Sequence, residues 1–298
     1  MKTWIAAAEL LVATLIWGFG FTATIWAQHS FDTITLTLSR FTICFVVTSA
    51  IIFFQPSTRP FLNRRYLRMS FWPGIFLGIT LLLQTWGLEY TSATNSSFIT
   101  TLYVVFVPLI ELLIFKHKLR QLHFVWVTIA LVGTGLMVNL QLGQFNSGDV
   151  LTLACSVTAA LQIVLIGRQS QQIESPLAYN AFQSLWAAVA AALFIPFYPH
   201  CYFRTLDWRA ALGTFSLIFG STLLGFFLQV KAQKTLSSSL SSLLFLLESP
   251  FALLFAVLLL DERITLLQAL GGLLIFLAAF GATRLARPKQ QPKNDAAL

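Results

Sequence analysis

Two stretches of this chain share one pattern: SATNSSFITTLYVVFVPLIELLIF at residues 92–115 and SSSLSSLLFLLESPFALLFAVLLL at residues 237–260. A shift of 145 residues aligns them and pairs Ser92 with Ser237. The same shift pairs Leu83-Gln84 with Leu228-Gln229, and Ser96-Ser97 with Ser241-Ser242. Polar side chains are rare and costly in hydrocarbon, so the matched serines and glutamines weigh more than matched leucines. The pattern therefore indicates an internal repeat.

The composition is that of an integral membrane protein. Hydrophobic residues make up 57% of the chain and charged residues 10%, and the mean hydropathy is +0.76. A soluble domain carries about a quarter charged residues, so this chain cannot cover a water-exposed surface of ordinary size. We therefore expect the lipid bilayer to surround most of it.

Ten apolar stretches each approach the length of about 20 residues that a helix needs to cross a bilayer. They are residues 4–26, 33–54, 70–89, 92–115, 121–140, 148–168, 175–197, 209–230, 236–259 and 265–285. Because a repeat of five spans is odd-numbered, the second copy enters the membrane from the opposite side. We predict an all-α membrane protein with ten transmembrane helices in two inverted five-helix repeats, at 4–140 and 148–285, and a disordered cytoplasmic tail at 286–298. Inverted repeats are typical of carriers whose substrate site lies between the halves at the midplane.

Basic residues are distributed unequally between the two sides of this arrangement. With a cytoplasmic N-terminus, fifteen lysines and arginines lie on the inner side, against Arg204, Arg209 and Arg263 on the outer side. Cytoplasmic loops carry such an excess. We therefore predict a protein of the cell inner membrane with both termini in the cytoplasm. The net charge of +8 is then a topology signal and does not indicate nucleic-acid binding.

Arg40 lies about seven residues from the outer end of its predicted span. A charge near the bilayer centre costs about 2.5–3.5 kcal/mol on insertion scales, so Arg40 should face a cavity or a partner. One hypothesis is that it holds a carboxylate or phosphate of a substrate. The other is a structural pair with a glutamate or with carbonyls at a helix end. The sequence leaves both open.

Glu248 lies near the middle of another predicted span, and Ser237 and Ser241 share its helical face. Pro250 follows two residues later and, lacking an N–H group, frees a backbone carbonyl one turn earlier. Glu248 is suited to carry a proton or to bind a cationic group. The alternative is a structural hydrogen bond at the helix break. Proton coupling is therefore a hypothesis that rests on Glu248 alone.

Polar and aromatic residues in several spans predict a central cavity. Besides Arg40 and Glu248, the candidate substrate-binding residues are Trp17, Gln84, Asn95, Tyr103, Gln162, Tyr179, Gln183 and Gln229. Tyr179, Gln183 and Trp186 form one stripe on a helix face. A single such residue is more often a helix–helix hydrogen bond of about 0.6 kcal/mol, but a set spread over several helices indicates a cavity. Close helix packing is predicted at Gly133, Gly135, Gly271, Gly272 and Gly281.

The chain carries no constellation typical of an enzyme or a metal site. Cys44, Cys155 and Cys201 form no pattern, the four histidines fall in or next to predicted loops, and no Gly-x-Ser-x-Gly or ATP-binding loop occurs. We therefore expect no catalytic residue, no metal and no cofactor. An intramembrane enzyme is kept as a remote alternative, and inverted halves disfavour a scaffold or channel.

Five short motifs stand out: Leu15-Ile16-Trp17-Gly18, Ser39-Arg40-Phe41, Leu247-Glu248-Ser249-Pro250-Phe251, Leu260-Asp261-Glu262-Arg263-Ile264 and Gly271-Gly272. Through them roughly residues 5–285 resemble the drug/metabolite transporter superfamily, and within it the family built from paired EamA domains. The first half departs from the pattern in two places. Pro108 lies three residues past the position that matches Pro250, and Lys116-His117-Lys118-Leu119 stands where Asp261-Glu262-Arg263-Ile264 stands in the second half.

The resemblance implies a secondary active transporter that exports a small polar metabolite, such as an amino acid, by alternating access between the two halves. The alternative substrates are lipophilic cations or drugs of the quaternary ammonium type. In such proteins the last span of each half lies outside the central pathway as a support or a dimer contact. A monomer and a homodimer both remain open.

Overall fold

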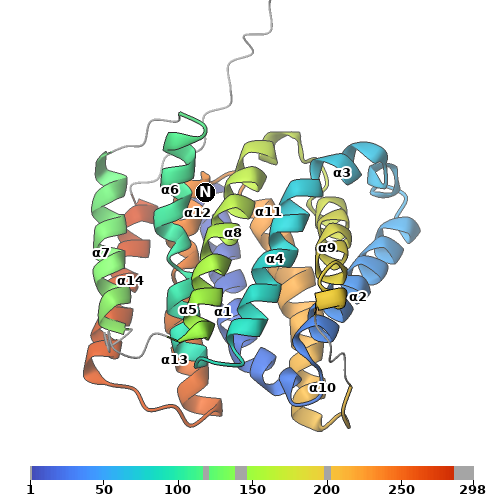
Figure 1. The fold of residues 1–298 in the computed structure, drawn as a ribbon. Helices are drawn as coiled ribbons and strands as arrows, with labels where there is room; N and C mark the ends of the chain where they lie inside the picture. The colour runs from blue at the N-terminus through green and yellow to red at the C-terminus, as the bar shows by residue number, and fades with distance from the viewer. Residues whose placement is uncertain (1, 117–120, 138–145, 198–202, 285–298) are drawn as a thin grey trace, which may run out of the picture.

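A computed structural model describes residues 2–116, 121–137, 146–197 and 203–284 (Figure 1). The predicted tail at 286–298 lies outside these residues. Regular secondary structure within them is helical, apart from one isolated antiparallel bridge between Phe31 and Phe203. The helices are α1 (Lys2–Gln28), α2 (Thr33–Phe54), α3 (Arg64–Met69), α4 (Phe71–Gly87), α5 (Ala93–Thr100), α6 (Tyr103–Leu113), α7 (Gln121–Met137), α8 (Ser147–Gln169), α9 (Pro176–Ala192), α10 (Trp208–Phe215), the π-helical segment η4 (Ser216–Gly225), α11 (Phe226–Ala232), α12 (Ser238–Phe245), α13 (Glu248–Leu259) and α14 (Leu266–Arg284).

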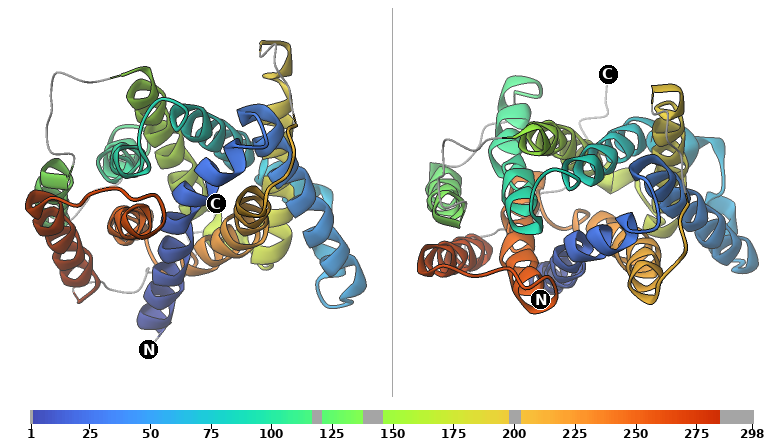
Figure 2. Two further views of the ribbon diagram at one scale, coloured as in Figure 1. Left: turned by 90° about the horizontal axis from the view of Figure 1, so that it is seen from below. Right: turned by 60° about the horizontal axis from the view of Figure 1, so that its bottom comes forward.

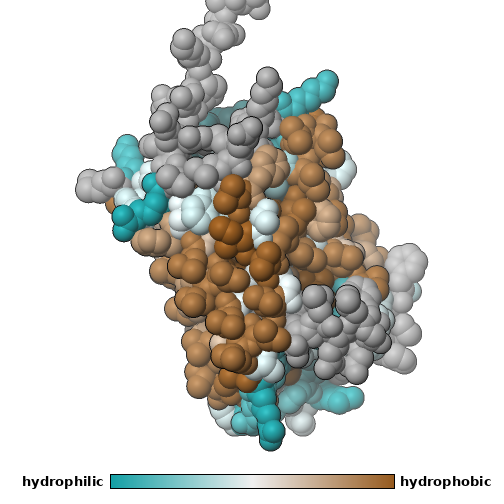
Figure 3. Space-filling model, turned by 90° about the vertical axis from the view of Figure 1, so that its left-hand side faces the viewer, coloured by the Kyte–Doolittle hydropathy of each residue, from teal (hydrophilic) through white to brown (hydrophobic). Residues whose placement is uncertain are grey.

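The helices match a membrane setting in length and surface. Seven helical segments of the described residues are long and apolar enough to cross a bilayer. The prediction of ten spans also needs α4, α7 and α9, which have 17 residues each, the lower end of the usual range of about 17–25. Figure 3 shows a broad apolar band between polar ends on the face that carries α7 and α14. The protein is an all-helical membrane protein.

Three predicted spans are not single α-helices. The span 92–115 breaks between α5 and α6 at Thr101-Leu102, and the span 236–259 breaks between α12 and α13 at Leu246-Leu247. At the second break Pro250 has no N–H to give to the carbonyl of Leu246, which instead accepts the N–H of Ser249 at 3.2 Å. The third exception is the span 209–230, whose centre is the π-helical segment η4.

The 145-residue repeat extends over most of the described fold. The pairs α1 and α8, α5 and α12, and α7 and α14 each begin 145 residues apart, and α4 matches η4 plus α11 from end to end. Lys116 and Asp261, which are also 145 apart, have the positive φ values of 54° and 57°. In Figure 1, α5 and α13 lie toward one end of the molecule and α6 and α12 toward the other. The two broken helices therefore run in opposite directions.

Helix packing joins the two halves of the sequence. The second-half elements α13, α10 and η4 pack on α1, and the first-half elements α4, α5 and α6 pack on α8. The α2–α9 and α7–α14 pairs also cross between the halves, and the second pair lies at the edge of the bundle (Figure 2). A Cβ on Gly133 would lie 2.7 Å from the carbonyl oxygen of Gly271, so close packing is confirmed there. It is wrong for Gly135, which has nothing within 4 Å of a Cβ.

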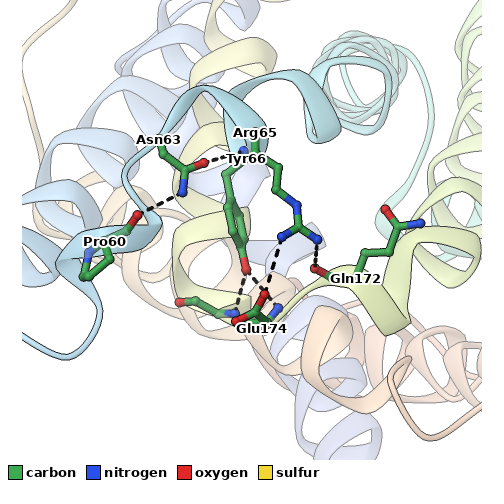
Figure 4. A network of polar contacts seen from close by, with 7 residues as sticks. Pro60, Asn63, Arg65, Tyr66, Gln172 and Glu174 are labelled. Atoms are coloured by element: carbon green, nitrogen blue, oxygen red, sulfur yellow. Dashed lines mark hydrogen bonds and ion pairs between the residues drawn. The ribbon is translucent and has the colours of Figure 1, made fainter.

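Hydrogen bonds join the halves where α3 meets the loop before α9 (Figure 4). We call this contact the first clasp. The phenol oxygen of the buried Tyr66 accepts the backbone N–H groups of Glu174 at 2.8 Å and Ser175 at 2.9 Å. Asn63 positions Tyr66 by capping its N–H at the start of α3. The Arg65–Glu174 ion pair, at 3.5 Å, is solvent-exposed and contributes little, because such pairs are screened by water.

The loops that correspond to this clasp under the 145-residue shift are also joined. Arg204 donates its backbone N–H to the carbonyl of Ser30 at 2.8 Å, and the Ser30 hydroxyl donates to the carbonyl of Thr205 at 3.0 Å. In the first clasp, the segment after α2, which contains α3, binds the loop before α9. In the second clasp, the loop after α9 binds the loop before α2. Two sets of hydrogen bonds therefore join the halves on the α2–α9 side of the bundle.

Replacing Tyr66 by phenylalanine tests the first clasp. Tyr66→Phe removes the acceptor of two backbone N–H groups, and a lost buried hydrogen bond costs about 1–3 kcal/mol. We expect a lower thermal midpoint for Tyr66→Phe in detergent, measured by intrinsic fluorescence. The control is Tyr90→Phe, at a tyrosine that is 53% exposed. Equal midpoints for the two variants would contradict the clasp.

Candidate functional site

A central cavity lies between the halves and is lined by residues of both. Its walls come from α1, α2, α4, α5 and α6 of the first half and from α8, η4, α11, α12 and α13 of the second. Seven of the ten predicted site residues line it: Trp17, Arg40, Gln84, Tyr103, Gln162, Gln229 and Glu248. The cavity is therefore built from both halves.

Three predicted site residues, Asn95, Tyr179 and Gln183, do not line this cavity. Asn95 lies in the first turn of α5, where its N–H bonds to the hydroxyl of the capping Ser92. Tyr179 is fully buried and donates its hydroxyl to the Gln169 side chain at 2.7 Å. Gln183 is fully buried where α9 packs on α4, beside Gly74.

Two members of the polar stripe on α9, Tyr179 and Trp186, form hydrogen bonds with neighbouring segments. Trp186, the third member of the stripe, donates its indole N–H to the carbonyl of Leu67 at 2.8 Å. Because α9 packs between α2 and α4, its polar face meets neighbouring helices and loops rather than the central cavity. Tyr179 therefore lies in the packing of α9 against its neighbours and not in the lining of this cavity.

Arg40 is 2% exposed and is held by two hydroxyl groups of η4. Its Nε donates to Thr222 Oγ1 at 2.9 Å and its Nη2 to Ser221 Oγ at 3.0 Å. Neither predicted structural partner, a glutamate or a set of helix-end carbonyls, is found among the described residues. Arg40 thus lines the cavity as a buried cation bound to neutral groups.

Glu248 is the first residue of α13, directly after the helix break, and is 7% exposed. Tyr103, the first residue of α6, donates its hydroxyl to Glu248 Oε2 at 3.4 Å. The two residues are 145 apart, so positions related by the repeat meet at the cavity. Gly18 permits the close approach of α1, because a Cβ there would lie 3.0 Å from the carbonyl oxygen of Glu248. Glu248 forms no ion pair with a described residue.

Trp17 is part of an aromatic wall. Its ring centroid lies 5.1 Å from that of Phe226 and 5.2 Å from that of Phe245. A Cβ on Gly225 would come within 2.5 Å of the indole nitrogen, so only glycine fits beneath the ring. The indole N–H donates to the carbonyl of Ser221 at 3.2 Å. The sequence did not single out Phe226 and Phe245, because the chain has 28 phenylalanines.

The glutamines of the cavity are also engaged with other helices. Gln229 Nε2 donates to Gln162 Oε1 at 2.9 Å, which joins α11 to α8. Gln84 Nε2 donates to the hydroxyl of Thr100 at 3.2 Å. These side chains form hydrogen bonds between helices and also line the cavity. Arg40 and Glu248 differ from them in carrying charge.

Comparison with known proteins assigns the family. A sequence profile of the EamA-like transporter family matches residues 4–139 and again residues 146–284. A protein of Archaeoglobus fulgidus, described as an uncharacterized transporter, is 32% identical over 284 residues, which cover 93% of this chain and 85% of that protein. One solved crystal structure superposes with a TM-score of 0.73 at 21% identity, covering 95% of this chain and 98% of the other, and so shares the fold. The chain belongs to the EamA-like transporter family and is a membrane transporter, not an enzyme.

Proposed function

We propose that this transporter is a secondary active carrier that exports a small polar metabolite, an amino acid, across the cell inner membrane. The observation that carries the proposal is that two opposite charges line one cavity: Arg40 comes from the first half and Glu248 from the second. Neither forms an ion pair with a described residue. The cavity thus offers one site for an anionic group and one for a cationic group.

A zwitterion complements this arrangement. A charge removed from water is costly unless an opposite charge or hydrogen bonds compensate it. The carboxylate of an amino acid would compensate Arg40, and its ammonium group would compensate Glu248. The aromatic wall of Trp17, Phe226 and Phe245 would contact the amino-acid side chain.

The runner-up substrates are lipophilic cations. Glu248 and the aromatic wall suit a quaternary ammonium group, because aromatic faces attract cations. Arg40 opposes this, since a cation in the cavity would meet a buried positive charge with no anionic partner among the described residues. The charges therefore favour a zwitterion over a cation.

We further propose that the fold consists of ten transmembrane helices in two inverted halves, 4–140 and 148–285. The helix bounds that recur after 145 residues, the opposite directions of the broken helices and the two profile matches support this. Cytoplasmic termini are supported by charge: the N-terminus and the arginine-rich α3 lie toward the same end in Figure 1, and basic residues favour the cytoplasmic side.

Alternating access needs closures at both ends of the cavity, and the broken helices supply one candidate at each end. Ser239 of α12 donates its hydroxyl to Glu111 of α6. Thr94 of α5, which is 145 residues before Ser239, donates its hydroxyl to Glu262 just after α13. Each contact joins the first turn of one broken helix to the far end of the other, at opposite ends of the bundle. We propose that they are gates that open one at a time.

Ligand binding by Arg40→Gln tests the zwitterion site. We expect wild-type protein in a thermal-shift screen to be stabilised by at least one of the proteinogenic amino acids. Because a hydrogen bond to a charged group contributes about 1.5–3 kcal/mol, Arg40→Gln should weaken that binding about tenfold or more. Arg64→Gln, at an exposed arginine of α3, is the control. Stabilisation by quaternary ammonium compounds alone would favour the runner-up.

Transport by Glu248→Gln tests proton coupling. In proteoliposomes, we expect saturable counterflow of labelled substrate by both wild type and Glu248→Gln. Only the wild type should accumulate substrate when a pH gradient is imposed, because the amide cannot carry a proton. Glu174→Gln, at a 62% exposed side chain, should behave as wild type. An unchanged response of Glu248→Gln to the gradient would rule out this role.

Cross-linking tests the gates. In a cysteine-free background, one protein would carry Ser239→Cys with Glu111→Cys and another Thr94→Cys with Glu262→Cys. Oxidation of either pair should stop counterflow, because one end of the cavity can then no longer open, and reduction should restore it. Proteins with one of the four substitutions control for the loss of the native contact. Counterflow that persists after complete cross-linking would show that the contact is not a gate.

A further inference from the structure

The segment Ser221–Leu223, inside the π-helical η4, collects polar contacts from three other helices. Its two hydroxyl side chains hold the guanidinium of Arg40 from α2, at 2.9 and 3.0 Å. The carbonyl of Ser221 accepts the indole N–H of Trp17 from α1 at 3.2 Å. Asn180 of α9 donates its Nδ2 to the carbonyls of Thr222 and Leu223, each at 3.1 Å. Asn180, Ser221 and Thr222 were not among the residues expected from sequence.

The carbonyls of residues 221–223 can accept from side chains because each carbonyl oxygen has two lone pairs. In an α-helix each carbonyl accepts an N–H four residues later, whereas π-helical turns shift this pairing, and they recur at functional sites. The hydroxyl of Thr222 donates to the carbonyl of Leu217, five residues earlier, at 2.7 Å. Side chains of α1 and α9 then supply donors to the carbonyls of residues 221–223.

The direction of each hydrogen bond around Thr222 is determined. A hydroxyl has one proton, and that of Thr222 goes to the carbonyl of Leu217. Its oxygen can therefore only accept, and it accepts from Nε of Arg40. A serine hydroxyl at this position would serve equally, but an isosteric valine would leave Nε–H without this acceptor.

The contacts to η4 orient Arg40 without cancelling its charge. Hydroxyl groups are neutral, and no described carboxylate forms an ion pair with Arg40. Its Nη1 has no recorded hydrogen bond to a described residue. The guanidinium is thus fixed through Nε and Nη2, while its positive charge remains available to a ligand in the cavity that Arg40 lines.

We propose that Ser221, Thr222 and Asn180 are positioning residues that make the cavity selective for a carboxylate. Ser221 and Thr222 aim the guanidinium of Arg40, and Asn180 secures the π-helical turn that presents the two hydroxyls. The proposal rests on the proposed function, in which Arg40 binds the anionic end of the substrate. These contacts join α2 of the first half to η4 and α9 of the second. Both halves therefore contribute to the anion site.

The test measures selectivity rather than transport alone. Binding of the twenty proteinogenic amino acids and of their C-terminal amides would be measured on purified full-length protein, since an amide keeps the ammonium group but lacks the carboxylate. Thr222→Val should weaken binding of the best amino acid about tenfold, because the guanidinium of Arg40 must then be ordered when the carboxylate binds, and leave binding of its amide unchanged. Thr222→Ser should retain the wild-type ratio of the two affinities.

Further variants separate positioning from stability. Ser221→Ala and Asn180→Leu should lower the same affinity ratio. Thr134→Val removes a buried threonine hydroxyl from α7, which contributes no residue to the cavity lining, and should leave the ratio unchanged. If Thr222→Val is too unstable to purify, Ser221→Ala gives the same readout, because Ser221 holds Arg40 through a separate nitrogen.

The outcomes distinguish this inference from the proposed function. A wild type that binds acid and amide equally would overturn the anion site at Arg40, and the positioning role with it. A wild type that prefers the acid, together with a Thr222→Val protein that keeps this preference, would overturn the positioning role only. Equal weakening of acid and amide by Thr222→Val would also overturn it, because that is the effect of general destabilisation.

Discussion

Hydrocarbon offers no hydrogen-bond partner, so a polar group inside a membrane bundle must find its partner within the protein or in a bound ligand. Most polar groups around the cavity follow this constraint in pairs: Gln229 with Gln162, and Gln84 with Thr100. Arg40 and Glu248 follow it only in part, since neutral hydroxyls hold them and no described countercharge does. The charges of these two side chains are what the proposed zwitterionic substrate would compensate.

Broken helices are the structural means of bringing such groups to the centre. A continuous α-helix satisfies its own backbone, whereas each break releases carbonyls and N–H groups that must be paired again nearby. Glu248 and Tyr103 both stand directly after a break, and Ser249 crosses between the broken helices by donating to the carbonyl of Ser97 at 3.2 Å. The breaks therefore place side chains and join the halves at once.

The sequence predicted those features of the fold that depend on rare residues. Serines and glutamines in apolar spans are few enough that their recurrence after 145 residues identified the repeat, and single deep charges identified Arg40 and Glu248 as cavity groups. Pro250 indicated the break before α13, but the sequence did not predict the interruptions in the spans 92–115 and 209–230, where no comparable residue marks the break. Tyr179 and Gln183 do not line this cavity, and the sequence could not show that, since a polar stripe has the same pattern whether it faces a cavity or a neighbouring helix. The sequence did not single out Asn180, because its hydrogen-bond partners are backbone carbonyls, which have no sequence signature.

Tyr103 and Glu248 occupy the same place in the two copies of the repeat and touch each other. In a molecule with identical halves, exchanging the roles of the copies would return an indistinguishable structure, and the states open to either side would have the same energy. Here the exchange swaps a phenol for a carboxyl group. In the proposed alternating-access cycle the two states are therefore chemically distinct, and no symmetry requires their populations to be equal. The Tyr103–Glu248 contact thus removes, at the centre of the protein, the symmetry that two identical copies would have.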